Sequence, residues 1–300
     1  MSNTWELDIR RGWIIGLIIG VLLLATAVAL VVLAAINPIS IWTFLAGVGA
    51  VAALFALIRL IYQLWGLANA SYEMDRNVVI IHWSSIQHQI PMASVRAILS
   101  GAEVRGLRLR PGLRWPGYFV SLGEADEIGP VLAYATGPLN AQVIIRTEGM
   151  AYAISPTDLE GFLQAFRERL EMGPTQEVEE QSTYPAFLDW TIWKDRWGLG
   201  ALLGSAVLLV LLVGVLCWRY PYLPPEIALR FNAAGEALLV ADTARIFYLG
   251  LLGVIFLLIN GGLGLFFYRR ERAASYFLWS GLVAVQVGLW AAVISILLQQ

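Results

Sequence analysis

Long apolar stretches alternate with polar ones along the chain. Five stretches carry almost no charged side chain, at residues 13–36, 41–67, 197–218, 246–268 and 276–298. As a helix rising about 1.5 Å per residue, each is long enough to cross a hydrocarbon core about 30 Å thick. The pattern therefore predicts a bundle of five transmembrane helices.

One charged residue, Arg59, lies inside a predicted span, near its later end. Its side chain could extend to the membrane interface, beside the belt-like aromatic residues Tyr62 and Trp65. A functional buried charge is the alternative. The last three spans contain no Asp, Glu, Lys, Arg or His, which argues against an ion-coupled transporter.

Glycine pairs and flanking charges add detail to the predicted bundle. Gly16 with Gly20, and Gly200 with Gly204, predict close helix packing, either within the chain or at a dimer face. Positive residues favour the cytoplasmic side of a membrane. They concentrate on one set of flanks, at Arg10, Arg11, Arg76, Lys194, Arg196, Arg269, Arg270 and Arg272. This predicts a cytoplasmic N-terminus, an extracytoplasmic C-terminus and an outer loop at 219–245.

The polar stretch at 72–170 changes its periodicity near its end. Apolar residues alternate in about seven short segments, at 78–83, 86–90, 95–99, 118–122, 131–136, 143–147 and 151–154, which predict antiparallel strands. A helical stripe follows, formed by Leu159, Phe162, Leu163, Phe166 and Leu170. Ser155 as N-cap, Pro156 and Asp158 predict the start of this helix. We expect a small barrel with a C-terminal amphipathic helix over one open end.

Three short strings in this stretch, at 90–95, 134–136 and above all 154–163, resemble the pleckstrin-homology-like (PH-like) domains of bacterial membrane proteins. The resemblance implies an α+β membrane protein of the bacterial plasma membrane, with a PH-like domain inserted into the five-helix bundle. It also implies contact with membrane lipids, and assembly with a protein partner or with a second copy.

The outer loop carries a second resemblance. Its segment 223–236 is similar to part of an uncharacterised bacterial membrane family that includes SdpI-type toxin-immunity proteins. That family usually has Pro and His where this chain has Ala228 and Arg230, and often an acidic residue where it has Ala237.

These patterns divide the chain into four parts. Residues 1–71 hold the N-terminal tail and two helices, and 72–171 hold the cytoplasmic domain. Residues 172–196 form a flexible acidic linker followed by an interfacial aromatic segment, and 197–300 hold three helices.

Three groups of residues are candidate contact sites. Arginine forms bidentate contacts with phosphate, so one loop is a candidate site for anionic lipid, at Arg105, Arg108, Arg110 and Arg114. The alternative is a solvated or topogenic basic loop. Helical spacing in the aromatic segment predicts an interfacial anchor or an extended aromatic belt at Phe187, Trp190, Trp193 and Trp197. The outer loop offers ligand-contacting or structural polar residues, at Glu226, Arg230, Asn232 and Glu236.

Composition and motifs exclude several classes. A hydrophobic share of 58% with 14% charged residues fits a membrane protein, and a net charge of −2 argues against a nucleic-acid partner. Cys217 is the only cysteine, and with His82 and His88 it is too little for a His/Cys metal site. No phosphate-binding glycine loop, metalloprotease or serine-hydrolase motif occurs. We therefore predict no metal, no cofactor and no enzyme activity. The expected function is a membrane scaffold or sensor; the alternative is a transport or toxin-immunity component acting through the helices and outer loop.

Overall fold

A computed structural model describes residues 3–104, 106–109, 114–176, 178, 180–183, 191–231 and 237–299. The chain forms two compact units. Unit 1 comprises Met1–Ala25 and Ala53–Asp189, and unit 2 comprises Thr26–Ala52 and Trp190–Gln300. The first two long helices contribute to both units.

Five helices in the described part of the chain are long and apolar enough to cross a membrane. They are α1 (Arg10–Ile36), α2 (Ile41–Ala68), α4 (Arg196–Arg219), α5 (Phe247–Phe267) and α6 (Arg272–Leu298). Each matches a predicted span to within a few residues. In the hairpin of α1 and α2, a Cβ atom on Gly16 would lie 2.5 Å from Leu64 Cδ2. This glycine pair therefore serves packing within the chain.

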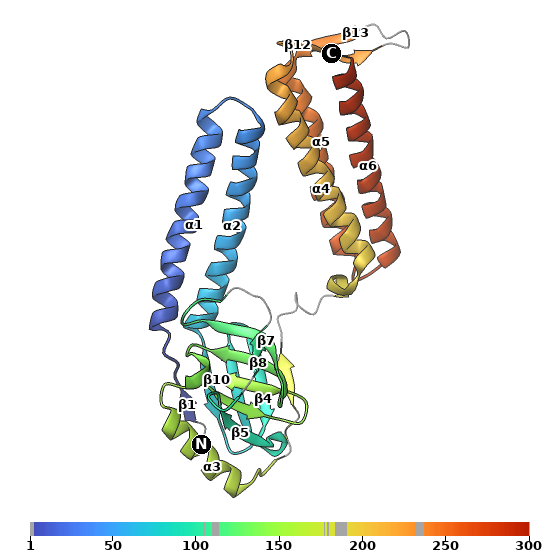
Figure 1. The fold of residues 1–300 in the computed structure, drawn as a ribbon. Helices are drawn as coiled ribbons and strands as arrows, with labels where there is room; N and C mark the ends of the chain where they lie inside the picture. Colours follow the sequence, from blue (N-terminus) through green and yellow to red (C-terminus); the bar gives the residue numbers. More distant parts are fainter. Residues whose placement is uncertain are drawn as a thin grey trace. The chain divides into compact units, whose positions relative to one another are not determined.

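Two sheets build the β-rich part of unit 1 (Figure 1). The first has the order β1-β2-β3-β4-β11, with bounds Asn3–Trp5, Ser71–Met74, Val78–Trp83, Ile86–Pro91 and Gln181–Thr183. The second has the order β5-β9-β10-β8-β7-β6, with bounds Ala97–Ser100, Val143–Arg146, Ala151–Ile154, Gly129–Ala135, Phe119–Ala125 and Arg108–Leu109. All seven predicted strands are present.

The topology differs from the prediction in two respects. Strand β10 enters the second sheet between β8 and β9 and pairs in parallel with β8, so this sheet is not wholly antiparallel. Strands β1 and β11 come from residues predicted to be a tail and a flexible linker. Each has only three residues, which is too short to show an alternating pattern.

The core of the domain lies between the two sheets. Alternate residues of β3 point inward, among them Val79 and Ile81, and Tyr152 and Ile154 of β10 meet them from the second sheet. Helix α3 (Leu159–Met172) completes this cluster with fully buried Phe162 and Phe166. The opposite face of β10 is also buried, under Leu99, Val104 and Leu107.

The start of α3 differs from the prediction at one residue. Asp158, not Ser155, caps the helix, because its Oδ1 accepts a hydrogen bond of 2.9 Å from Gly161 N–H. Ser155 directly follows β10, and its Oγ accepts hydrogen bonds from Thr136 N–H (2.7 Å) and Gly137 N–H (3.1 Å), just after β8. The Ser155 hydroxyl, predicted to cap the helix, therefore binds the backbone that follows β8.

In unit 2, the helices α4, α5 and α6 pack together, and the outer loop is an antiparallel hairpin of β12 (Glu226–Phe231) and β13 (Ala237–Asp242). Ile227 of this hairpin is buried in a cluster with Leu216, Ile246 and Val293. The base of the loop is therefore part of the core of the helical unit.

The burial of α3 generates a stability prediction. Phe166→Ala removes a fully buried ring and should destabilise the domain by about 3–5 kcal/mol. Leu170→Ala is the matched control on the same stripe, because Leu170 is 47% exposed and should matter far less. Hydrogen–deuterium exchange of β3 and β10 in the full chain measures the difference. Equal acceleration by both variants would contradict the assigned core.

Candidate functional site

The loop before β7 lies directly against the first turn of α1. Trp115 Nε1–H donates a hydrogen bond of 2.8 Å to the Gly12 carbonyl, and the Trp115 ring stacks on Tyr118 at 4.3 Å. Gly117 has a positive φ of 93°, and a Cβ atom on it would lie 2.3 Å from Gly12 N. Both glycines are required because any side chain there would push the loop away from the helix.

The turn between β3 and β4 contacts the end of α2 in the same way. The hydroxyl of Tyr62 hydrogen-bonds to that of Ser85 at 3.1 Å, and a Cβ atom on Gly66 would lie 3.0 Å from Ser84 Cβ. Among the described residues, Ser84 is the only non-glycine with a positive φ. The domain therefore contacts the ends of both helices, as Figure 1 shows. We name this contact the helix–domain seam.

The predicted basic loop is divided by the structure. Arg105 and Arg110 lie outside the described residues. Arg108 belongs to β6, opposite Glu124, and lines a cavity of about 840 Å³ with Glu124 and Asp126. Arg114 is different, because it immediately precedes Trp115 and is exposed at the helix–domain seam.

Sequence reasoning missed a second arginine at the seam. Arg11 precedes Gly12 and lines a small cavity of about 190 Å³ with Asp8 and Gly117. The linear sequence gives no signal for this proximity, since Trp115 and Gly12 are 103 residues apart. Arg59 lies near Tyr118 at the helix–domain seam. Burial raises the pKa of Tyr118, and the positive charge of Arg59 is one of the smaller effects that lower it. This position fits the interfacial interpretation of Arg59.

The domain core also contains a buried polar residue. His88 of β4 is 1% exposed. One ring nitrogen, Nδ1, hydrogen-bonds to Ser182 Oγ at 2.7 Å, and Nε2 hydrogen-bonds to Tyr134 Oη at 3.0 Å. Burial lowers the pKa of His88 to about 4, so the imidazole is neutral at pH 7. Tyr152, whose ring centre lies 5.9 Å from that of His88, donates a hydrogen bond of 2.7 Å to Glu180 Oε1.

The predicted aromatic anchor is not one continuous helix. Phe187 and Trp190 lie outside the described residues. Trp193 belongs to a short 3-10 helix, Thr191–Lys194, and Trp197 to the first turn of α4; they are 56% and 86% exposed. Asp195 separates the two because its carboxylate caps α4.

Asp195 also joins the ends of α4, α5 and α6. Its Oδ1 accepts from Trp197 N–H (3.1 Å) and Gly198 N–H (3.0 Å), and its Oδ2 accepts from the hydroxyls of Tyr268 (2.8 Å) and Tyr276. These bonds, chiefly those from Gly198 and Tyr276, lower the pKa of Asp195 to about 2. An aspartate that precedes an apolar helix is a sequence signal for this N-cap.

The four candidate contact residues of the outer loop are only partly described by the structure. Glu226 lies opposite Asp242 in the outer hairpin. The side chain of Arg230, and the whole of Asn232 and Glu236, lie outside the described part, so their ligand role stays a prediction. No group of three or more His, Cys, Asp or Glu that could hold a metal occurs among the described residues.

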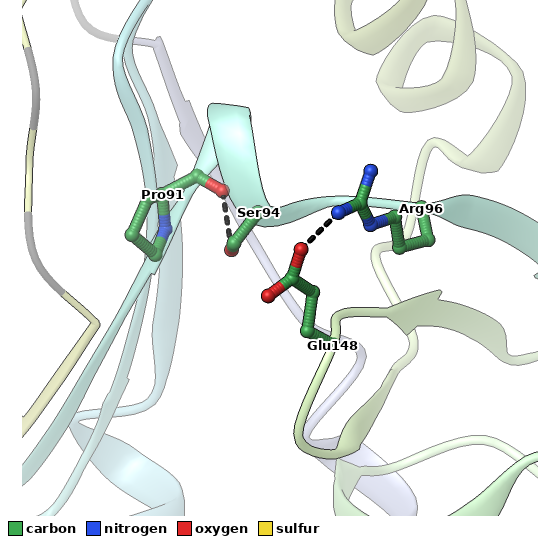
Figure 2. A network of polar contacts seen from close by, with 4 residues as sticks. All are labelled: Pro91, Ser94, Arg96 and Glu148. Atoms are coloured by element: carbon green, nitrogen blue, oxygen red, sulfur yellow. Dashed lines mark hydrogen bonds and ion pairs between the residues drawn. The ribbon is translucent and has the colours of Figure 1, made fainter.

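An exposed ion pair joins two loops of the β-rich domain. Figure 2 shows Arg96 paired with Glu148, next to the bond of 2.8 Å from Ser94 Oγ–H to the Pro91 carbonyl. The pair connects the start of β5 to the turn between β9 and β10. Both side chains are more than half exposed, so we expect it to contribute at most about 1 kcal/mol.

The comparison with known families agrees with this architecture. Residues 70–170 match the family model described as "Bacterial PH domain". The β-rich domain at residues 70–170 is therefore PH-like, and with the five apolar helices it fits a membrane-associated protein. No curated protein and no solved structure matches the chain. The resemblance of segment 223–236 to the SdpI-type family stays a prediction.

The buried imidazole predicts a pH dependence of stability. An unfolded His has a pKa of about 6.5, so between that pH and about 4 the unfolded chain binds a proton that folded His88 does not. Stability should therefore fall as the pH drops through this window. His88→Gln removes this pH-dependent contribution to the free energy of unfolding. The difference in unfolding free energy between wild type and variant should therefore narrow as the pH falls from about 7 to about 4.5. Denaturant unfolding measures it, with His82→Gln as the control; a constant gap would contradict the assigned neutral His88.

The Asp195 contacts predict a stabilising role in unit 2. Asp195→Ala removes four accepted hydrogen bonds, of which loss of the helix cap alone should cost about 0.5–2 kcal/mol. Glu271→Ala is the control, because Glu271 stands at the N-cap of α6 without a side-chain cap. Thermal unfolding of the full chain in detergent should show a lower midpoint for the first variant only. Identical midpoints would show that the cluster contributes no stability.

Proposed function

We propose that this chain is a non-enzymatic membrane scaffold or sensor that holds its PH-like domain against the cytoplasmic face of a bacterial plasma membrane. The observation that supports it most directly is the helix–domain seam. Because Trp115 and Gly117 pack on Gly12, the domain has a fixed position at the end of α1. A domain fixed in this way presents one surface to lipid and leaves the remainder for protein contacts.

The proposed orientation follows from the basic flanks. Arg10 and Arg11 begin α1, and Arg76 lies in the domain that follows α2. With these residues inside, the N-terminus is cytoplasmic, the outer hairpin and the C-terminus are extracytoplasmic, and the PH-like domain lies in the cytoplasm.

The proposed lipid contact lies at the seam. Arg11 and Arg114 lie where α1 would enter the membrane, and the exposed aromatic residues Tyr62 and Trp65 of α2 mark the interface. A basic residue near an anionic leaflet contributes about 1 kcal/mol. Two such residues would favour anionic lipid there without a deep binding pocket.

The lipid proposal can be tested with the full chain in nanodiscs. Phosphatidylglycerol should slow hydrogen exchange at residues 114–125, by about fivefold for each arginine contact of about 1 kcal/mol. Replacing Arg105, Arg108, Arg110 and Arg114 with Ser removes the Arg114 contact and leaves Arg11, so the slowing should fall by about fivefold.

The control removes the same charge elsewhere on the domain, by replacing Arg96, Arg146, Arg167 and Arg169 with Ser. Two of these, Arg167 and Arg169, belong to α3, which Figure 1 places at the end of the domain away from α1 and α2. This variant should keep the phosphatidylglycerol effect. An equal response in both variants would remove the lipid contact from the proposed function.

A further inference from the structure

The outer edge of β4 is covered by a strand from the linker that leads to α4. Strand β11 pairs Gln181, Ser182 and Thr183 with Gln89, His88 and Gln87. All three residues of β11 are exposed, so the strand adds no apolar side chain to the core. What holds it is a short backbone ladder and a few polar contacts.

Two of these polar contacts are made by side chains that reach into the domain. Ser182 Oγ lies 2.7 Å from His88 Nδ1, and Glu180 Oε1 accepts a hydrogen bond of 2.7 Å from Tyr152 Oη–H. Residues two apart in a strand point to the same face, so Glu180 and Ser182 act together. Gln181 and Thr183 alternate with them.

The domain side of these contacts is a fixed part of the core. His88 is held between Ser182 and Tyr134, with ring centres of His88 and Tyr134 5.0 Å apart. A strand leaving β4 would remove a hydrogen-bond partner from a buried imidazole and expose unpaired backbone groups on the edge. The edge therefore favours occupation by a strand that offers the same two groups.

We propose that the β4 edge, with His88 and Tyr152, is a docking site for an extended protein segment that carries a carboxylate and, two residues later, a small hydroxyl side chain. The chain's own Glu180–Ser182 segment occupies it in cis and so competes with a partner. The proposal rests on the scaffold function and names the chemistry of its protein partner. Main-chain pairing supplies the affinity, and the two side-chain contacts supply the selectivity.

The tethered strand β11 competes with any added peptide for the β4 edge. A tethered segment acts at an effective concentration in the millimolar range, so a free peptide competes poorly unless the tethered strand is weakened. Glu180→Gln/Ser182→Ala weakens it, because an amide oxygen accepts the Tyr152 hydrogen bond less strongly than a carboxylate does and the Ser182 hydroxyl is lost. Gln181→Ala/Thr183→Ala is the matched control, since it changes the same strand at the alternate positions.

The probe is a fluorescent peptide with the sequence of residues 178–183, Val-Glu-Glu-Gln-Ser-Thr, added to the full chain in nanodiscs. We expect the Glu180→Gln/Ser182→Ala protein to bind it at least tenfold more tightly than the control protein. A second peptide, in which the same carboxylate and hydroxyl are replaced, should bind neither protein. Equal affinity of the two proteins, or equal affinity for the two peptides, would overturn the proposal.

Hydrogen exchange provides a second readout and separates the two proposals. Exchange at residues 86–91 should accelerate in the Glu180→Gln/Ser182→Ala protein and slow again when the first peptide is added. Failure of the peptide to slow it would also overturn the docking site. The phosphatidylglycerol effect at residues 114–125, measured in the same samples, reports the membrane contact independently of peptide binding.

Discussion

The position of the PH-like domain depends on the hydrogen bond between the Trp115 indole and the Gly12 carbonyl. The carbonyl belongs to the first turn of α1, and the indole is 5% exposed within an apolar cluster that contains Trp13, Leu67 and Tyr118. Partners that lie this deep are costly to separate, because each would lose a bond that water could not easily replace. Glycines at 12 and 117 allow the two backbones to approach. Hydrogen bonding, ring stacking and small residues thus act at one place, and they convert a flexible attachment into a defined contact.

A related combination of glycine and tryptophan occurs at one end of unit 2. Trp279 is fully buried, and a Cβ atom on Gly264 would lie 2.1 Å from its Nε1, while one on Gly198 would lie 2.6 Å from its Cζ3. The Gly198 amide also donates a hydrogen bond to the Asp195 carboxylate. In unit 2, therefore, a large ring fills space left by missing side chains, whereas in unit 1 the missing side chains of Gly12 and Gly117 let two backbone segments meet. In both units a hydrogen bond lies at the end of a helix. Such contacts tolerate little change in volume because neither side can collapse without moving a helix.

Burial explains which parts of this fold the sequence could predict. The five long helices and strands such as β3 were predicted because lipid or a core imposes a length or a period on their residues. Contacts that depend on distant residues left no such trace. The three-residue strands β1 and β11 have no period to detect, and the insertion of β10 beside β8 places Ser155 next to Thr136, which reassigns the helix cap to Asp158. The pairing of Trp115 with Gly12 is likewise invisible in the linear sequence, and so the contribution of Arg11 to the candidate site was missed.

The docking of β11 also limits how far the linker can reach. An extended chain spans at most about 3.5 Å per residue. The chain from Gly173 to Thr191, where a 3-10 helix begins, has 18 residues and could span at most about 63 Å. With Thr183 held on β4, only the eight residues from Thr183 to Thr191 remain, which could span at most about 28 Å. The same two side-chain contacts that cover the β4 edge therefore set the length of the connection between the PH-like domain and α4.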